Sequence, residues 1–468
     1  MRLYEINTRV HCQKFDQITA EELRELSDMG FDAIWLMGVW QISEAARKIS
    51  RIVSEDFFGS PFAVPSYRIS QPLGGKGRFQ SLVDRAHDAG LSVIVDFVSN
   101  HMAMDSPWIK ERPDFFIRSN RRVRPQSTSD FFLHESGEVI SFGRDPYFPP
   151  WHDTAQLDYT SEGLRARMTE VLSRISQVAD GVRCDMAMLV LRDYIRHQWY
   201  PFAPQAWFDE KMPAEFWSGA VEETKRRSPA FSFIAEAYWD KERTLLDLGF
   251  DLAYEKRLYD GLVARDPSLI LGRLSRPMAD LEGSLYFIEN HDEPRAASRF
   301  SREENLAAAG LILSLPGSVL IHEGQMEGKR EQLPVQRLRP VTDETPDENL
   351  RAAYRNLLEI TRAEVFRHGS FQLLEAGPEG IVGFARRHQD RAIVYVGQIG
   401  ERSNFASAAV DLTPLIKSDS ASTRLRVVNL LTSRSIVLEG ASGLFQLRTM
   451  DLGIDRATRF CLIETKPV

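Results

Sequence analysis

Short apolar runs alternate with longer stretches of helical periodicity from the start of the chain to about residue 360. Apolar runs bounded by polar or turn residues predict buried strands, here at residues 3–8, 33–37, 92–97, 181–185, 231–236, 248–253, 285–289 and 318–322. Leucines and valines recur at helical spacing between them, as in residues 20–29 and 79–89, which end at Gly30 and Gly90. Eight such units predict an α/β fold, a TIM-type (β/α)8 barrel, rather than an open doubly wound sheet.

Two regions depart from this alternation. Between the third strand and a helix starting near Ser161, residues 102–160 are too long for an ordinary loop, which predicts an inserted subdomain over the barrel's catalytic face. After about residue 365, short alternating runs replace helical periodicity, at residues 381–386, 392–397, 425–429, 435–438 and 459–464. We therefore predict a barrel of residues 1–101 and 161–365, an inserted subdomain of residues 102–160, and a C-terminal antiparallel β-sandwich domain of residues 366–468.

Composition and charge narrow the classes of partner. The chain is 43% hydrophobic and 26% charged, as in globular proteins, and it has no run of about 18 apolar residues, so a membrane partner is not expected. A net charge of -8 argues against a nucleic-acid partner. Three widely spaced cysteines, Cys12, Cys184 and Cys461, match neither a disulfide framework nor a zinc site. With no export signal at the N-terminus, we expect a reducing, cytoplasmic location.

Three carboxylates, Asp185, Glu236 and Asp292, each follow an apolar run. In a parallel barrel such strand ends meet at one face. Cleaving a glycosidic bond requires one carboxylic acid that protonates the leaving oxygen and one carboxylate that meets the developing positive charge. A single acid of this kind more often caps a helix or pairs with an arginine, so the surrounding residues decide between the two interpretations.

Those surroundings favour a site. Arg183 lies two positions before Asp185, so both side chains project to one face of the strand, and the arginine would keep Asp185 ionised. His291 precedes Asp292, and His101 follows the third strand. Polar clusters at several strand ends are hard to explain as separate structural features.

Four segments carry a resemblance to a known family: DFVSNH at residues 96–101, GVRCD at 181–185, EAYWD at 236–240 and FIENHD at 287–292. In this order they resemble the conserved regions of the α-amylase family of retaining glycoside hydrolases and transglycosidases, glycoside hydrolase family 13. The resemblance extends over the barrel and the C-terminal β domain.

This resemblance implies roles for individual residues. Asp185 would be the nucleophile, Glu236 the general acid and base, and Asp292 the carboxylate that holds the sugar hydroxyls. Arg183, His101 and His291 would complete the glucose subsite. The implied double displacement places the Asp185 and Glu236 carboxyl groups about 5 to 5.5 Å apart.

Residues 59–67 align with the segment where the family places an aromatic ring against the sugar, which implies stacking by Phe62. Judged without the family, a core phenylalanine in a loop is an equal alternative. For two further sets of residues, a functional and a structural interpretation also remain open. His322 and Glu323 would either line the site rim or pack the last strand. The aromatic residues of the insertion would either line a sugar groove or, for most of them, form a core: Trp108, Phe115, Phe116, Tyr147, Phe148 and Trp151.

The chain departs from the family pattern beside the nucleophile. Members that act on long α-1,4-glucans often have Lys-His three and four positions after it, whereas this chain has Met188 and Leu189. The change removes a polar contact and a possible calcium ligand. Asn100 and Asp158 remain as weak calcium candidates, but two oxygen ligands fall short of the six to eight that calcium takes. We expect that no cofactor is required, with calcium as a possibility.

The function expected from the sequence is that of a retaining α-glycosidase. Its partner would be an α-glucan, an oligosaccharide such as a malto-oligosaccharide, or a small α-glucoside. An α-glucanotransferase on the same scaffold is the alternative, because hydrolysis and transfer share the covalent intermediate and differ in how water is excluded. A non-catalytic carbohydrate-binding protein would be distinguished by loss of the acidic residues, and all three are present.

Overall fold

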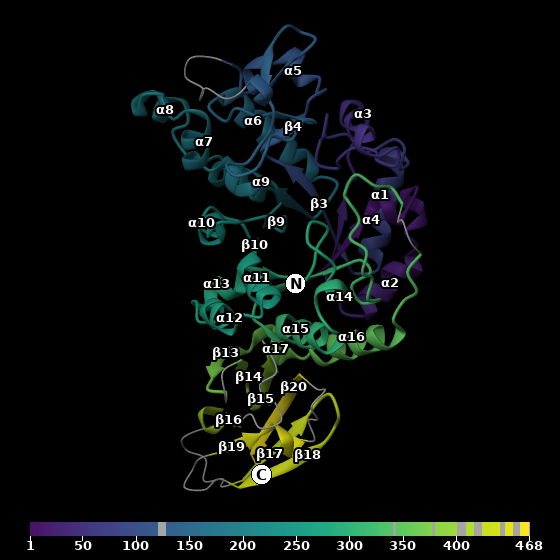
Figure 1. Ribbon diagram of the computed structural model, residues 1–468, viewed down its shortest axis with the longest axis vertical. Coiled ribbons are helices and arrows are strands. Elements are labelled where there is room, and N and C mark those ends of the chain that lie inside the picture. Colours follow the sequence, from purple (N-terminus) through teal and green to yellow (C-terminus); the bar gives the residue numbers. More distant parts are fainter. Residues whose placement is uncertain are drawn as a thin grey trace. The chain divides into compact units, whose positions relative to one another are not determined.

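The computed structural model describes residues 1–119, 128–339, 343–376, 380–399, 409–415, 424–439, 445–452 and 459–467. Eight strands within these ranges close a parallel barrel in the order β1, β2, β3, β8, β9, β10, β11 and β12, with β12 beside β1. Figure 1 labels β3, β9 and β10 of this barrel. Their bounds are β1 (Arg2–Asn7), β2 (Ala33–Met37), β3 (Ser92–Val98), β8 (Gly181–Asp185), β9 (Ser232–Ala235), β10 (Leu252–Tyr254), β11 (Ser284–Tyr286) and β12 (Ser318–His322). The predicted TIM-type barrel is confirmed.

The predicted strand bounds match at β2, β8 and β12, and differ most at β10. The prediction for β10 began at Leu248, but α10 (Glu242–Asp247) ends there and Gly249 turns the chain with φ 103°. Phe250 then packs its ring on Trp217, with the ring centroids 4.9 Å apart. The apolar residues before Leu252 therefore belong to a packed turn, which resembles a strand in sequence.

Helices follow the strands as the periodicity predicts. The prediction of a helix over residues 20–29 corresponds to α2 (Ala20–Asp28), and that over residues 79–89 to α4 (Gly75–Asp88). Gly30 and Gly90 follow these helices with φ 88° and φ 81°, values that a residue without a Cβ adopts readily. No helix in the described part of the chain has the length and apolarity needed to cross a membrane.

The described residues form two compact units. The N-terminal unit comprises residues 3–254 and 333–343, and the C-terminal unit comprises residues 1–2, 255–332 and 344–468. Besides the elements above, helices of the N-terminal unit include α1 (Thr8–His11), α3 (Glu44–Val53), α6 (Glu162–Ile175), α7 (Arg192–Trp199), α8 (Gln205–Lys211) and α9 (Phe216–Arg227). Helices α6 and α9 pack side by side on the outside of the barrel strands (Figure 1).

The insertion after β3 is part of the N-terminal unit. It contains α5 (Trp108–Glu111) and two short antiparallel pairs, β4 (His101–Ala103) with β7 (Thr154–Gln156) and β5 (Phe131–Leu133) with β6 (Val139–Ser141). Trp108, Phe115 and Phe116 are buried, so these rings form a core. Tyr147 and Phe148 remain 67% and 64% exposed.

The C-terminal unit pairs helices with an antiparallel sheet. The sheet has the order β13 (Ser370–Leu374), β14 (Ile381–His388), β15 (Arg391–Gln398), β20 (Phe460–Pro467), β17 (Arg424–Asn429) and β18 (Ser435–Glu439). The helices are α11 (Lys256–Ala264), α12 (Pro267–Leu274), α13 (Met278–Glu282), α14 (Ala296–Arg299), α15 (Arg302–Ser314), α16 (Glu348–Ile360) and α17 (Glu364–His368). The predicted antiparallel C-terminal domain is confirmed.

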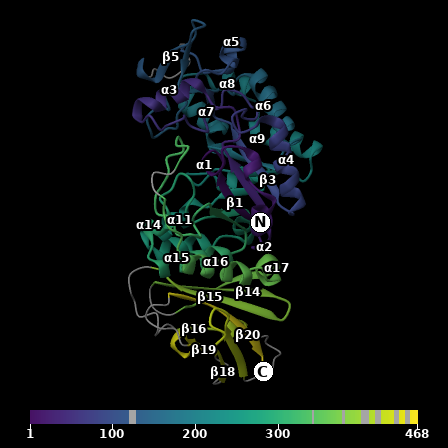
Figure 2. The same ribbon diagram turned by 90° about the vertical axis from the view of Figure 1, so that its right-hand side faces the viewer.

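The two faces of this sheet cover different cores. Figure 2 shows α15 and α17 against β14 and β15, where Tyr395 donates its hydroxyl to the carbonyl of Ala307 at 2.9 Å. Neighbours along the strand point to the opposite face. There Val394 packs with Val410 of β16 (Ala409–Asp411) and Leu447 of β19 (Gln446–Arg448), which form a second, two-stranded sheet.

Candidate active site

Asp185 and Glu236 lie at the ends of two neighbouring strands of the N-terminal unit. Asp185 is the last residue of β8, and Glu236 comes directly after β9. The two strands pair in parallel, and the backbone N–H of Glu236 donates to the carbonyl of Cys184 at 3.1 Å. Both carboxylates are almost completely buried, with 6% and 3% of the residue exposed.

The Arg183 guanidinium holds the two carboxylates. Its Nη1 donates to Oδ1 of Asp185 at 2.7 Å, and its Nη2 lies 2.8 Å from Oε2 of Glu236. Burial alone would lower the pKa of Arg183, but the negative charges around it outweigh that effect and raise the pKa well above its usual value. The guanidinium therefore stays charged and places a positive charge between the two acids.

Each carboxylate oxygen of Glu236 has its own partners. Oε2 also accepts the backbone N–H of Met186 at 2.6 Å. Oε1 accepts the hydroxyl of Tyr238 at 2.8 Å. Met186, which donates this N–H directly after Asp185, adopts a left-handed conformation with φ 45°.

Phe62 and His101, two of the predicted substrate-binding residues, lie beside this cluster. The Phe62 ring lies 5.2 Å from the guanidinium carbon of Arg183 and is partly exposed. His101 hydrogen-bonds the Phe62 backbone and lies beside Trp151, with ring centroids 5.0 Å apart. Burial lowers the pKa of His101 to about 3, so its ring is a neutral hydrogen-bonding group at ordinary pH.

Asp292 and His291 belong to the C-terminal unit, in the loop after β11. His291 Nε2 lies 3.0 Å from Oδ2 of Asp292, and the Asp292 side chain is 45% exposed. The Asn290 side-chain oxygen accepts the backbone N–H groups of Asp292 and Glu293 at 3.0 and 2.9 Å. This hydrogen-bonded turn leaves the Asp292 carboxylate accessible to solvent.

A buried ion-pair network lies beside that turn. Arg295 Nη1 donates to Glu289 Oε1 at 2.6 Å and to the carbonyl of Glu323 at 2.7 Å. His322 Nδ1 lies 3.3 Å from the same Glu289 oxygen, and His322 is only 7% exposed. Of the two interpretations of His322, packing within the fold matches this arrangement.

Met188 and Leu189 occupy η4 (Ala187–Val190), a short 3-10 helix, and are 0% and 2% exposed. The Trp217 indole N–H donates to the carbonyl of Ala187 at 2.9 Å and fixes this turn. The two side chains that replace Lys-His are thus core residues and present no polar group.

Neither calcium candidate offers a free oxygen cage. The Asn100 side-chain oxygen accepts the Gln156 amide at 2.9 Å. Asp158 Oδ1 accepts the backbone N–H and hydroxyl of Thr160, and Oδ2 accepts the Tyr200 hydroxyl at 2.6 Å. Burial raises the pKa of Asp158, which favours its neutral form. This arrangement does not fit a calcium ion, and within the described ranges no group of three or more His, Cys, Asp or Glu side chains is placed to hold a metal.

Two tyrosines beside these carboxylates were not predicted from the sequence. The Tyr254 hydroxyl accepts from Arg183 Nε at 3.3 Å, and Tyr238 contacts Glu236 as described above. Tyr254 is the last residue of β10, so a correct end for that strand would have shown it at the same position as Asp185 in β8. Tyr238 stands two positions after Glu236.

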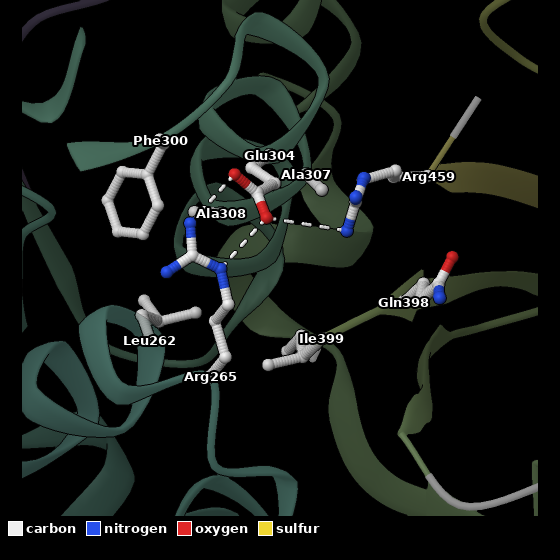
Figure 3. Close-up of a pocket in the computed structure, with 9 residues that line it drawn as sticks. All are labelled: Leu262, Arg265, Phe300, Glu304, Ala307, Ala308, Gln398, Ile399 and Arg459. Atoms are coloured by element: carbon white, nitrogen blue, oxygen red, sulfur yellow. Dashed lines mark hydrogen bonds and ion pairs between the residues drawn. The ribbon is translucent and has the colours of Figure 1, made fainter. Parts of the chain in front are cut away.

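A separate small, half-open pocket lies in the C-terminal unit among α11, α15 and the end of β15 (Figure 3). Glu304 lies in its wall between two arginines, 3.0 Å from Arg265 Nε and 3.5 Å from Arg459 Nη1. None of the predicted site residues lines this pocket. An internal ion pair of this kind is typical of structural packing.

Comparison with known proteins gives the same family as the motifs. Residues 17–247 match the model of the α-amylase catalytic domain. An α-amylase, MalA of Haloarcula japonica, is 26% identical over 343 residues, which is 70% of this chain and 44% of that protein. An α-1,4-glucan:maltose-1-phosphate maltosyltransferase of Salinibacter ruber is 33% identical over 250 residues, 50% of this chain and 32% of that protein. The chain thus spans less than half the length of these two relatives.

A solved structure matches the whole chain. The crystal structure of a maltogenic α-amylase, AmyB of Thermotoga neapolitana, superposes with a TM-score of 0.75 at 22% identity and covers 100% of this chain and 99% of its own. At this identity the superposition supports the fold. The motifs, the matching catalytic-domain model and the curated relatives agree with it, and the chain belongs to the α-amylase family.

Proposed function

We propose that the protein is a retaining α-glycosidase that acts on α-linked glucosides or malto-oligosaccharides. The observation that carries the proposal is the Arg183 guanidinium, which contacts Asp185 at 2.7 Å and Glu236 at 2.8 Å. The pair of carboxylates that glycosidic cleavage requires is thereby held on adjacent strand ends. The names of the relatives, an α-amylase and a maltosyltransferase acting on α-1,4-glucan, suggest the substrate class.

The mechanism is a double displacement. Asp185 attacks the anomeric carbon while Glu236 gives its proton to the departing glycosidic oxygen, which leaves a covalent glycosyl-enzyme. Glu236, now a carboxylate, takes a proton from water or a sugar hydroxyl, and that oxygen displaces Asp185 with net retention. Phe62 offers an aromatic face to the sugar, and Asp292 holds its hydroxyls.

Sugar transfer is the second candidate, and one observation favours it. The turn after Asp185 presents Met188 and Leu189, both buried and apolar, where polar residues stand in members that act on long α-1,4-glucans. Because this turn offers no polar side chain that could hold a water molecule near the intermediate, a sugar acceptor is favoured.

The three cysteines are buried free thiols, which supports our proposal of a reducing, cytoplasmic location. No step of the proposed mechanism uses a metal or another cofactor.

The deciding experiment uses α-glucosyl and α-maltosyl fluoride. We expect the wild-type protein to turn over at least one of them and to release the α-anomer first, as ¹H NMR of fresh product would record. Asp185→Asn should lose at least a thousandfold in kcat. A β-anomer as first product, or an Asp185→Asn variant as active as wild type, contradicts the mechanism. Asp193→Asn, an exposed carboxylate in the same unit, is the control.

A further inference from the structure

The two carboxylate oxygens of Glu236 have different partners, and this difference indicates on which side of Glu236 the leaving sugar lies. Oε2 accepts the Met186 backbone N–H at 2.6 Å and lies 2.8 Å from Nη2 of the positively charged Arg183. An oxygen that accepts a backbone N–H beside a full positive charge is an unfavourable place for a proton. The proton that Glu236 gives to the leaving oxygen therefore sits on Oε1, the oxygen that faces Tyr238 at 2.8 Å.

The leaving sugar must then lie on the Tyr238 side of Glu236. Trp239 follows Tyr238, and its ring is surrounded by tyrosines from two other segments. Tyr147 of the insertion meets it edge-on with centroids 4.9 Å apart, and Tyr194 of α7 lies tilted by 31° to it with centroids 5.6 Å apart. These three rings, which we name the aromatic platform, are partly or largely exposed.

Strained backbone conformations and backbone hydrogen bonds hold the platform in place. Trp239 and Asp240 both have left-handed conformations, with φ 59° and 58°, which are strained for residues other than glycine. On the insertion, the buried Asp145 carboxylate accepts the backbone N–H groups of Tyr147 and Phe148 at 2.6 and 2.9 Å. The fold thus fixes Tyr147 while leaving 67% of it exposed. Rings that served only as a core would be covered.

We propose that the aromatic platform of Trp239, Tyr147 and Tyr194 binds the sugar ring on the leaving-group and acceptor side of the bond that is cut. The proposal rests on the proposed function and adds the residues that select its second substrate. Pyranose rings present a C–H face that packs on aromatic rings, so the platform takes a neutral sugar. The aromatic platform would thus contact the sugar on the leaving-group side, where the buried apolar side chains of Met188 and Leu189 offer no polar contact.

Substrates with and without a leaving-group sugar separate this idea from the proposed function. Glycosyl fluorides carry only fluoride on that side and need no contact there. We expect Trp239→Ala to keep kcat/KM on a glycosyl fluoride within about threefold of wild type. On maltotetraose, kcat/KM should fall at least tenfold, and the KM of a maltose acceptor in transfer from the fluoride should rise at least tenfold. Trp239→Phe, which keeps an aromatic face, should recover most of the loss.

Controls make the outcome unambiguous. Phe202→Ala removes a ring of similar exposure, 66%, outside the platform and should change none of these values. Tyr147→Ala, at an exposed position, repeats the test if Trp239→Ala does not fold. Equal losses on fluoride and maltotetraose, or no loss on either, would overturn the platform while leaving the proposed function standing. Inactivity of wild type on every substrate would instead overturn the proposed function.

Discussion

At the scale of residues, the site depends on one positive charge between two negative ones. Asp185 and Glu236 are both buried, and two unpaired carboxylates in such a place would be costly. Arg183 compensates both, and its guanidinium carbon lies within 5.2 Å of the Trp35 and Phe62 ring centroids, so the ring faces also stabilise its charge. The same side chain therefore orients the acids and limits their repulsion.

His101 provides a prediction that can be tested by pH. Burial lowers its pKa from 6.5 to about 3, so between these values the unfolded chain binds a proton that the folded protein does not. Stability from this group is present above pH 6.5 and is lost as the pH falls toward 3. We expect His101→Gln to lose less stability on acidification than wild type, by about 1.4 kcal/mol per pH unit. Urea unfolding at pH 6.5, 5.5 and 4.5 measures this, and parallel pH profiles would refute it.

The positions of residues were predictable where a motif carried them. Asp185, Arg183 and Glu236 follow from strand ends and spacing, and the structure brings them together. Tyr238 and Trp239 escaped because their importance arises from contacts with Glu236, Tyr147 and Tyr194, up to 92 residues away in sequence. No local sequence pattern predicts left-handed residues other than glycine. The sequence therefore does not show that Trp239 and Asp240 are left-handed.

At the scale of elements, the loop after β11 is held by the loop after β12. Arg295 spans the two, from Glu289 to the carbonyls of Glu323 and Glu331 at 2.7 and 3.2 Å. Glu289 Oε2 also accepts the backbone N–H of Ala296 at 2.6 Å. Since Asn290, His291 and Asp292 follow Glu289 directly, this network sets the path of the segment that carries Asp292.

Arg295→Gln should therefore weaken both fold and activity. It leaves the buried Glu289 carboxylate without its cation, which costs about 3–5 kcal/mol for pairs of this kind. We expect a matching fall in the free energy of unfolding, and kcat reduced at least tenfold because Asp292 is less well positioned. Arg299→Gln, at an exposed position in the neighbouring α14, serves as the control. If both variants unfold at the same urea concentration, the network does not hold the loop.

Elements were predictable to the extent that burial imposed a pattern. Strand β2 is buried at every position, and its predicted and observed bounds agree. Strand β10 was shifted because Leu248 and Phe250 are as apolar as strand residues while packing in a turn. An apolar run in the sequence does not distinguish a strand from a packed turn, since side chains are buried in both.

At the scale of the whole molecule, the barrel and the C-terminal sheet were predictable as a sequence of elements, but the two compact units were not. The C-terminal unit joins β11, β12 and their helices to the antiparallel sheet through contacts far apart in the chain. Tyr395 donates to the carbonyl of Ala307, and Phe460 packs against Gly310. Such contacts depend on single side chains, which hydropathy does not reveal.

Gly310 tests whether helix α15 and the sheet are closely packed. Alanine is normally favoured over glycine inside a helix by about 1 kcal/mol. A Cβ at Gly310, however, would lie 2.5 Å from Cε2 of Phe460, so a ring of the sheet would have to move. Overpacking of this kind costs about 1–3 kcal/mol, and we expect Gly310→Ala to lower the free energy of unfolding despite its helical preference.

Gly272 of α12 provides the matched comparison, because a Cβ there meets nothing within 4 Å. Gly272→Ala should raise the free energy of unfolding by up to about 1 kcal/mol, through propensity alone. Opposite signs for the two variants in urea unfolding would mean that the sheet resists displacement by α15. If both alanines stabilise the protein equally, Phe460 yields freely, and the helix and the sheet do not share a tightly packed core at this position.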